Sequence, residues 1–126
     1  MSFIRTNPNP ANRQTGDCVI RAISIAENKS WDDVFLDLMI ESFYLKDMPS
    51  SNYAWGTYLR KNGYHRHVIS DLCPDCFSVA DFVGENPEGT YILGTGTHVI
   101  CVKDGSYYDT WDSGDAIPVY YFKKGE

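Results

Sequence analysis

The segment Gln14–Ala26, QTGDCVIRAISIA, begins as a polar loop and takes on a helical pattern at Cys18. Apolar residues at positions 19, 20, 23 and 26 repeat every three or four residues, which predicts an amphipathic helix over residues 18–28. Asp17 then supplies an acid at the helix N-terminus, where it is expected to cap the helix. A cysteine on the first turn is either a small buried core residue or a nucleophile, because the helix end favours its thiolate.

Patterns on either side of this helix predict an α+β domain. One helix is expected to start after Ser30, because Ser30 and Asp33 have a capping-box-like spacing. Another is expected over residues 52–61, and a short helix is expected to be capped by Ser78. Strand-like runs then cover residues 64–69, 90–93, 98–102, 106–111 and 117–122. We therefore expect N-terminal helices packed on a mostly antiparallel sheet. Residues 1–16, rich in Pro and Asn, are expected to form an irregular arm of one domain spanning residues 1–126.

The amino-acid composition of the chain argues against some classes of function. The chain has 126 residues, a formal net charge of -6 and 43% hydrophobic residues. Because no basic run occurs, nucleic acid is not an expected partner. Neither a secretory h-region nor an apolar run of membrane-spanning length is visible, so we expect a cytoplasmic protein with no membrane partner. Its four cysteines are then expected to be reduced thiols.

A histidine and an acid lie where they can support a thiolate. His98 begins the apolar run HVICV directly after Gly94-Thr95-Gly96-Thr97, a place suited to a base, although a half-buried structural histidine is the alternative. A two-residue turn at Asp104-Gly105 makes Asp109 a diagonal neighbour of His98. A loop one residue longer places Asp112 opposite His98 instead. Either acid is alternatively an exposed residue beside the turn.

This order of residues resembles the papain-like cysteine peptidase superfamily, in which a Cys opens a helix, a His starts a strand and an Asn or Asp follows. Papain-type enzymes carry Asn-Ser-Trp where this chain has Asp109-Thr110-Trp111, which implies that Asp109 orients His98 and that Trp111 shields their contact. Gly16-Asp17-Cys18 is similar to the Asp-Cys-Gly of bacteriocin-leader-processing peptidases. The whole chain resembles small papain-like proteins of gut bacteria and their prophages.

The same resemblance implies an amide side chain that stabilises the oxyanion, usually a Gln six residues before the Cys. Gln14 has the matching residue type but lies four residues before Cys18, whereas Asn12 has the matching spacing. We favour Gln14, together with the Cys18 backbone N–H.

These residues predict a papain-like thiol hydrolase that needs no cofactor and cleaves a peptide, isopeptide or amide bond through an acyl-enzyme. A protein or peptide is the expected substrate, and transfer of the acyl group to an amine is not separated from hydrolysis. The alternative is a catalytically silent binding protein of the same fold, phage-encoded and acting on a host protein. Oligomeric state is not predicted.

A second group of residues has metal-ligand character. The spacing His65-x-His67-x5-Cys73-x2-Cys76 offers four ligands of the types that bind zinc. The short span favours a structural turn at Cys73–Cys76 instead, and a redox pair is a third interpretation. We therefore favour no metal site. Cys101, within an apolar run, is expected in the core.

Overall fold

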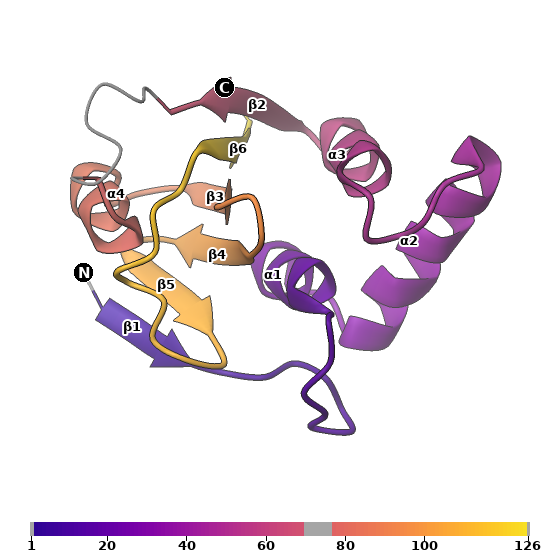
Figure 1. The fold of residues 1–126 in the computed structure, drawn as a ribbon, viewed down its shortest axis with the longest axis horizontal. Helices are drawn as coiled ribbons and strands as arrows, with labels where there is room; N and C mark the ends of the chain where they lie inside the picture. The colour runs from indigo at the N-terminus through magenta and orange to yellow at the C-terminus, as the bar shows by residue number, and fades with distance from the viewer. Residues whose placement is uncertain (1, 70–76, 126) are drawn as a thin grey trace.

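The computed structural model describes residues 2–69 and 77–125, and the α+β prediction is confirmed. The strands form one mostly antiparallel sheet in the order β1-β5-β4-β3-β6-β2 (Figure 1). The elements of the described residues are β1 (Ser2–Arg5), α1 (Cys18–Glu27), α2 (Trp31–Leu45), α3 (Asn52–Lys61), β2 (Tyr64–Val68), α4 (Val79–Glu85), β3 (Thr90–Gly94), β4 (Val99–Lys103), β5 (Ser106–Asp109) and β6 (Tyr120–Lys124).

Helices cover both faces of the sheet (Figure 1). One core joins α1, α2 and α3 to the first face and includes Ile23, Leu38 and Cys101, all fully buried. The other core joins α4 to the opposite face through residues such as Val79 and Ile100. Cys101 and Ile100 are neighbours in β4 and belong to different cores, as the alternation of side chains along a strand requires. The prediction that Cys101 is a core residue is confirmed.

The N-terminal arm is more ordered than predicted. Residues 2–5 form β1, which pairs in parallel with β5 and places Ser2 opposite Ser106. The Phe3 ring packs on the Tyr107 ring at 5.4 Å between centroids. The prediction of an irregular arm over residues 1–16 is therefore wrong for residues 2–5. Pairing with β1 satisfies backbone groups that β5 would otherwise expose at the sheet edge.

The hairpin that positions the candidate site has the predicted register. Lys103 pairs with Ser106 across the two-residue turn Asp104-Gly105. Both turn residues have positive φ, 49° and 83°, as a type I′ turn requires. Because the turn is this short, the end of β5 at Asp109 lies beside the start of β4, immediately after His98.

Several strand boundaries differ from prediction, among them the end of β5, which is Asp109 instead of residue 111. His98 precedes β4 rather than beginning it, and β6 starts at Tyr120 instead of residue 117. β6 pairs on both sides, with β3 and with β2. Pro118 has no backbone N–H to donate, so a strand with two neighbours begins after it.

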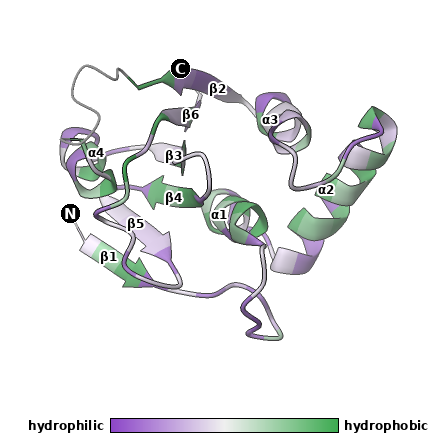
Figure 2. Ribbon diagram, in the orientation of Figure 1, coloured by the Kyte–Doolittle hydropathy of each residue, from purple (hydrophilic) through white to green (hydrophobic). Residues whose placement is uncertain are grey.

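Hydrophobic side chains are not confined to the core. Figure 2 shows hydrophobic residues on α1 and β4, where they are buried, and also along α2. The α2 helix exposes Leu36, Ile40, Phe43 and Tyr44 to solvent. Over residues 2–69 and 77–125, the structure contains no helix with the length and apolar character needed to cross a membrane.

Candidate active site

Cys18 is the first residue of α1 and is partly buried against the start of β4. Burial alone raises the pKa of its thiol, but interaction with the His98 imidazole and the backbone N–H of Val99 outweighs burial, with a smaller contribution from Arg21. The net result is a pKa below the ordinary thiol value. The positive end of α1 favours the same charge state. Cys18 therefore has the surroundings of a reactive thiolate rather than of a structural cysteine.

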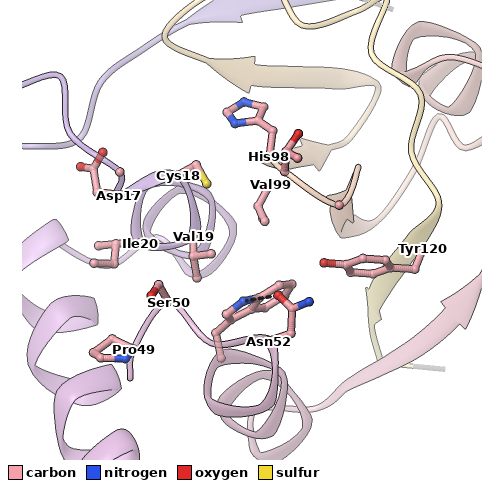
Figure 3. A pocket seen from close by; sticks show the side chains of 14 residues that line it. Asp17, Cys18, Val19, Ile20, Pro49, Ser50, Asn52, His98, Val99 and Tyr120 are labelled. Atoms are coloured by element: carbon pink, nitrogen blue, oxygen red, sulfur yellow. Dashed lines mark hydrogen bonds between the residues drawn. The ribbon is translucent and has the colours of Figure 1, made fainter. Parts of the chain in front are cut away.

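The acid next to Cys18 faces away from the sulfur (Figure 3). Asp17 occupies the N-cap position, but its side chain caps no backbone N–H. Its carboxylate instead forms an ion pair with Arg21 and accepts hydrogen bonds from Asn9 and Trp31. The expectation of a simple helix-capping acid is therefore wrong in detail. The Arg21 cation offsets a charge that would otherwise oppose a thiolate at Cys18.

A tight turn presents His98 to the sulfur. The backbone N–H of Thr95 donates to the His98 carbonyl at 2.9 Å, and the His98 N–H donates to Thr95 Oγ1 at 3.1 Å. Gly96 has a φ of 101°, which other residues rarely adopt. These contacts fix the backbone of His98 directly before β4, so its ring projects from the end of the sheet beside the N-terminus of α1.

Asp109 holds the far side of the imidazole. His98 Nε2 lies 2.6 Å from Asp109 Oδ2. The Asp109 bond and then the Cys18 interaction raise the pKa of His98 to about 9, against a smaller lowering by burial. Because Asp109 occupies Nε2, Nδ1 is the nitrogen left to exchange a proton with Cys18. The imidazole is therefore positively charged at neutral pH.

Further donors keep Asp109 ionised although it is only 5% exposed. Burial raises the pKa of Asp109, but hydrogen bonds from His98, the Ser113 hydroxyl and the Thr110 N–H lower it further than burial raises it. Ser113 donates to Oδ2 at 2.7 Å and the Thr110 N–H to Oδ1 at 2.8 Å. A carboxylate held at both oxygens can fix the ring orientation of His98.

The runner-up acid, Asp112, lies elsewhere. It accepts hydrogen bonds from the Tyr107 hydroxyl at 2.6 Å and from the Gly114 N–H at 3.0 Å, and none from His98. Trp111 does lie against His98, with ring centroids 5.2 Å apart and planes inclined by 29°. Trp111 is 49% exposed, so its ring lies between solvent and one face of the imidazole.

The two candidate oxyanion donors differ in position. Gln14 lines a cavity together with Cys18 and His98, and its amide makes no hydrogen bond to the described residues. Asn12 is outside that lining, adopts a left-handed backbone conformation and accepts a hydrogen bond from Asn7. Of these two candidates, Gln14 is therefore the one that shares a cavity with the sulfur and has no hydrogen bond to the described residues.

Two cavities meet at the sulfur and the imidazole. One, of about 410 Å³, lies between α1, α3 and β6 and includes Trp55 and Tyr120 among its walls (Figure 3). The other, of about 500 Å³, lies on the side of Gln14 and Trp111. Both include Cys18 and His98. An extended substrate can therefore pass across the thiol with a group in each cavity.

Two supporting residues were not identified from the sequence. Arg21 lies four residues after Asp17, a spacing at which helical side chains meet, so the sequence itself could have predicted this ion pair. Ser113 had none, because its bond to Asp109 depends on how the chain turns after β5.

The metal-ligand candidates are only partly described. Cys73 and Cys76 lie outside the described residues. His65 and His67 lie on β2, opposite Lys123 and Tyr121, and the His67 ring stacks on Tyr121 at 4.9 Å. Within residues 2–69 and 77–125, no three His, Cys, Asp or Glu side chains are grouped so as to hold a metal ion.

Comparison of the chain with models of protein families, with curated proteins and with solved structures gives no match. The chemistry of the site therefore follows from the residues around Cys18, His98 and Asp109 and from the cavities that they line.

Proposed function

We propose that the protein is a papain-like thiol hydrolase that cleaves a peptide, isopeptide or amide bond through an acyl-enzyme on Cys18. The observation that carries the proposal is the set Cys18, His98 and Asp109: the imidazole lowers the pKa of the thiol, and it is hydrogen-bonded in turn to the carboxylate. This set opens onto two cavities at once. A buried structural cysteine needs neither a charged imidazole nor access to a cavity.

In the first half-reaction, the Cys18 thiolate adds to the substrate carbonyl carbon. The carbonyl oxygen gains the negative charge and is stabilised by the Cys18 N–H and the Gln14 amide. The Cys18 N–H is free for this role because the first turn of a helix has no carbonyl four residues earlier to bind. His98 then donates the Nδ1 proton to the leaving amine, the carbon–nitrogen bond breaks, and a thioester remains on Cys18.

In the second half-reaction, the neutral imidazole accepts a proton from water while the water oxygen attacks the thioester. The thiolate leaves and the acid product forms. An amine in place of water gives acyl transfer by the same steps. Asp109 keeps the ring oriented throughout and stabilises its charged form, as the acid of a Ser-His-Asp triad does.

The test is direct detection of the acyl-enzyme with 4-nitrophenyl acetate. We expect a burst of about one equivalent of 4-nitrophenolate per chain, with the acetyl group on Cys18 by peptide mapping. Cys18→Ser and His98→Gln should lose the burst. Cys101 is an internal control, since burial raises its pKa to about 12 and it should remain unlabelled. Absence of acetyl-Cys18 in the wild-type protein would refute the hydrolase proposal and favour a catalytically silent binding protein.

A further inference from the structure

The second cavity carries a positive charge that catalysis, as described above, does not use. Arg13 lines this cavity with Gln14, Cys18 and His98. Its guanidinium is exposed and makes no hydrogen bond or ion pair with the described residues. An unpaired arginine beside a nucleophile is notable in a chain whose formal net charge is -6.

We infer that the substrate carries a carboxylate next to the scissile bond, and that Arg13 binds this carboxylate in the second cavity. The inference rests on the proposed function and adds a substrate class to it. Arginine suits this role because its planar guanidinium can donate two parallel hydrogen bonds to one carboxylate.

The surrounding charges leave Arg13 uncompensated. No aspartate or glutamate is among the residues that line this cavity. The acids next in sequence to lining residues are bonded elsewhere: Asp17 to Arg21, Asp109 to His98, and Asp112 to the Tyr107 hydroxyl. Arg21 also lines the cavity, but its charge is already offset by Asp17. Among the described residues that line this cavity, Arg13 is therefore the cation without an acidic partner.

The rest of the cavity wall supplies neutral polar groups. Thr15, Thr97 and Thr110 add hydroxyls, and Asn7 and Gln14 add amides. The backbone of this wall is also held in place, since Arg5 donates a hydrogen bond to the Thr110 carbonyl at 2.6 Å. A carboxylate here can keep part of its hydrogen bonding while it pairs with Arg13.

The first cavity has more apolar side chains in its walls, although Asp17, Ser50 and Asn52 also line it. Its walls include Val19, Ile20, Trp55, Val99 and Tyr120, which suit an apolar group. The two cavities flank the same sulfur, so the substrate has different chemistry on the two sides of the scissile bond. An amide with an apolar group on one side and a carboxylate on the other fits both.

The experiment measures alkylation of Cys18 by three chloroacetyl reagents of nearly equal size, from which the thiolate displaces chloride. Chloroacetyl-glutamyl amide carries a side-chain carboxylate, chloroacetyl-glutamine carries a terminal carboxylate, and chloroacetyl-glutaminamide is the neutral reference. We expect at least one acidic reagent to react about two- to fivefold faster than the neutral one, the range of an exposed ion pair. The faster acidic reagent identifies which kind of carboxylate the cavity takes.

Variants decide whether Arg13 is responsible. Arg13→Gln should bring the acidic-to-neutral rate ratio close to one. Lys46→Gln, which removes an equal charge from the exposed end of α2, should keep the wild-type ratio. A wild-type ratio of one, a ratio unchanged in Arg13→Gln, or an equal loss in Lys46→Gln would overturn the inference and leave the hydrolase proposal intact. A Cys18 that reacts with none of the reagents would overturn both.

Discussion

Replacing Asp109 with Asn should lower the pKa of His98 by at least about one unit. Asp109 is the largest cause of the raised His98 pKa of about 9, through the 2.6 Å contact between Nε2 and Oδ2. Asn keeps the shape and one hydrogen-bonding oxygen but removes the negative charge. The imidazolium then loses its main electrostatic partner, and the His98 pKa should move toward the ordinary value of about 6.5.

The expected change is large at a mildly alkaline pH. An imidazole with a pKa of about 9 is about 90% protonated at pH 8, whereas one with an ordinary pKa of about 6.5 is about 3% protonated. The asparagine variant should fall between these limits. Loss of the imidazolium also removes the largest of the influences that lower the Cys18 pKa, so the variant should hold less thiolate at neutral pH.

The assay is an NMR titration of the histidine ring protons from pH 5 to pH 10. The chain has three histidines, and a His98→Gln variant assigns the signal of interest. Because coupled groups titrate as a pair, the comparison is repeated in a Cys18→Ala background, where the thiol no longer contributes. A wild-type His98 midpoint close to 6.5, or one that does not move in Asp109→Asn, would refute the assigned His98–Asp109 pair.

Three further perturbations probe the support around the site. Arg21→Met should lower the free energy of unfolding, measured in urea, by about 3–5 kcal/mol, because it leaves the buried Asp17 carboxylate without its cation. Adding Asp17→Asn should recover part of this loss, and no destabilisation would contradict the assigned ion pair. Gly94→Ala should lower the free energy of unfolding by about 1–3 kcal/mol, because the added Cβ would overlap the Tyr120 ring. A Cβ at Gly84 meets nothing within 4 Å, so Gly84→Ala should not destabilise the protein, and equal effects of the two changes would rule out the steric explanation. Trp111→Ala should shift the His98 midpoint in the same NMR titration by less than Asp109→Asn, because exposing the ring weakens the Asp109 interaction and also relieves the burial that lowers the pKa. A larger shift would mean that shielding outweighs the charge.

Local signals in the sequence predicted the elements that position the site. The turn Asp104-Gly105 fixes the register of β4 and β5, and that register was sufficient to single out Asp109 once the short turn was assumed. The helix α3 was predicted with its observed bounds, Asn52–Lys61, and Ser78 was correctly predicted to cap the start of α4. Each of these features depends on residues close together in the chain, where propensity and turn geometry dominate.

Features that depend on distant residues were not predictable in the same way. The pairing of β1 with β5 joins residues about a hundred positions apart, and nothing in the polar N-terminal composition indicates it. The role of Asp17 was also misjudged, because its partners Asn9 and Trp31 come from outside α1. Tertiary contacts of this kind override a local capping preference.

The most direct test of whether Cys18 is an activated thiol is the pH dependence of its alkylation by iodoacetamide, in the wild-type protein and in His98→Ala. Peptide mapping restricts the measurement to the label on Cys18. We expect the wild-type midpoint to lie below the ordinary thiol value and to rise when His98 is removed, since burial is then the largest remaining influence on the thiol. A wild-type rate that climbs about tenfold per pH unit from pH 6 to pH 8, with the same profile in His98→Ala, would show that Cys18 is an ordinary thiol.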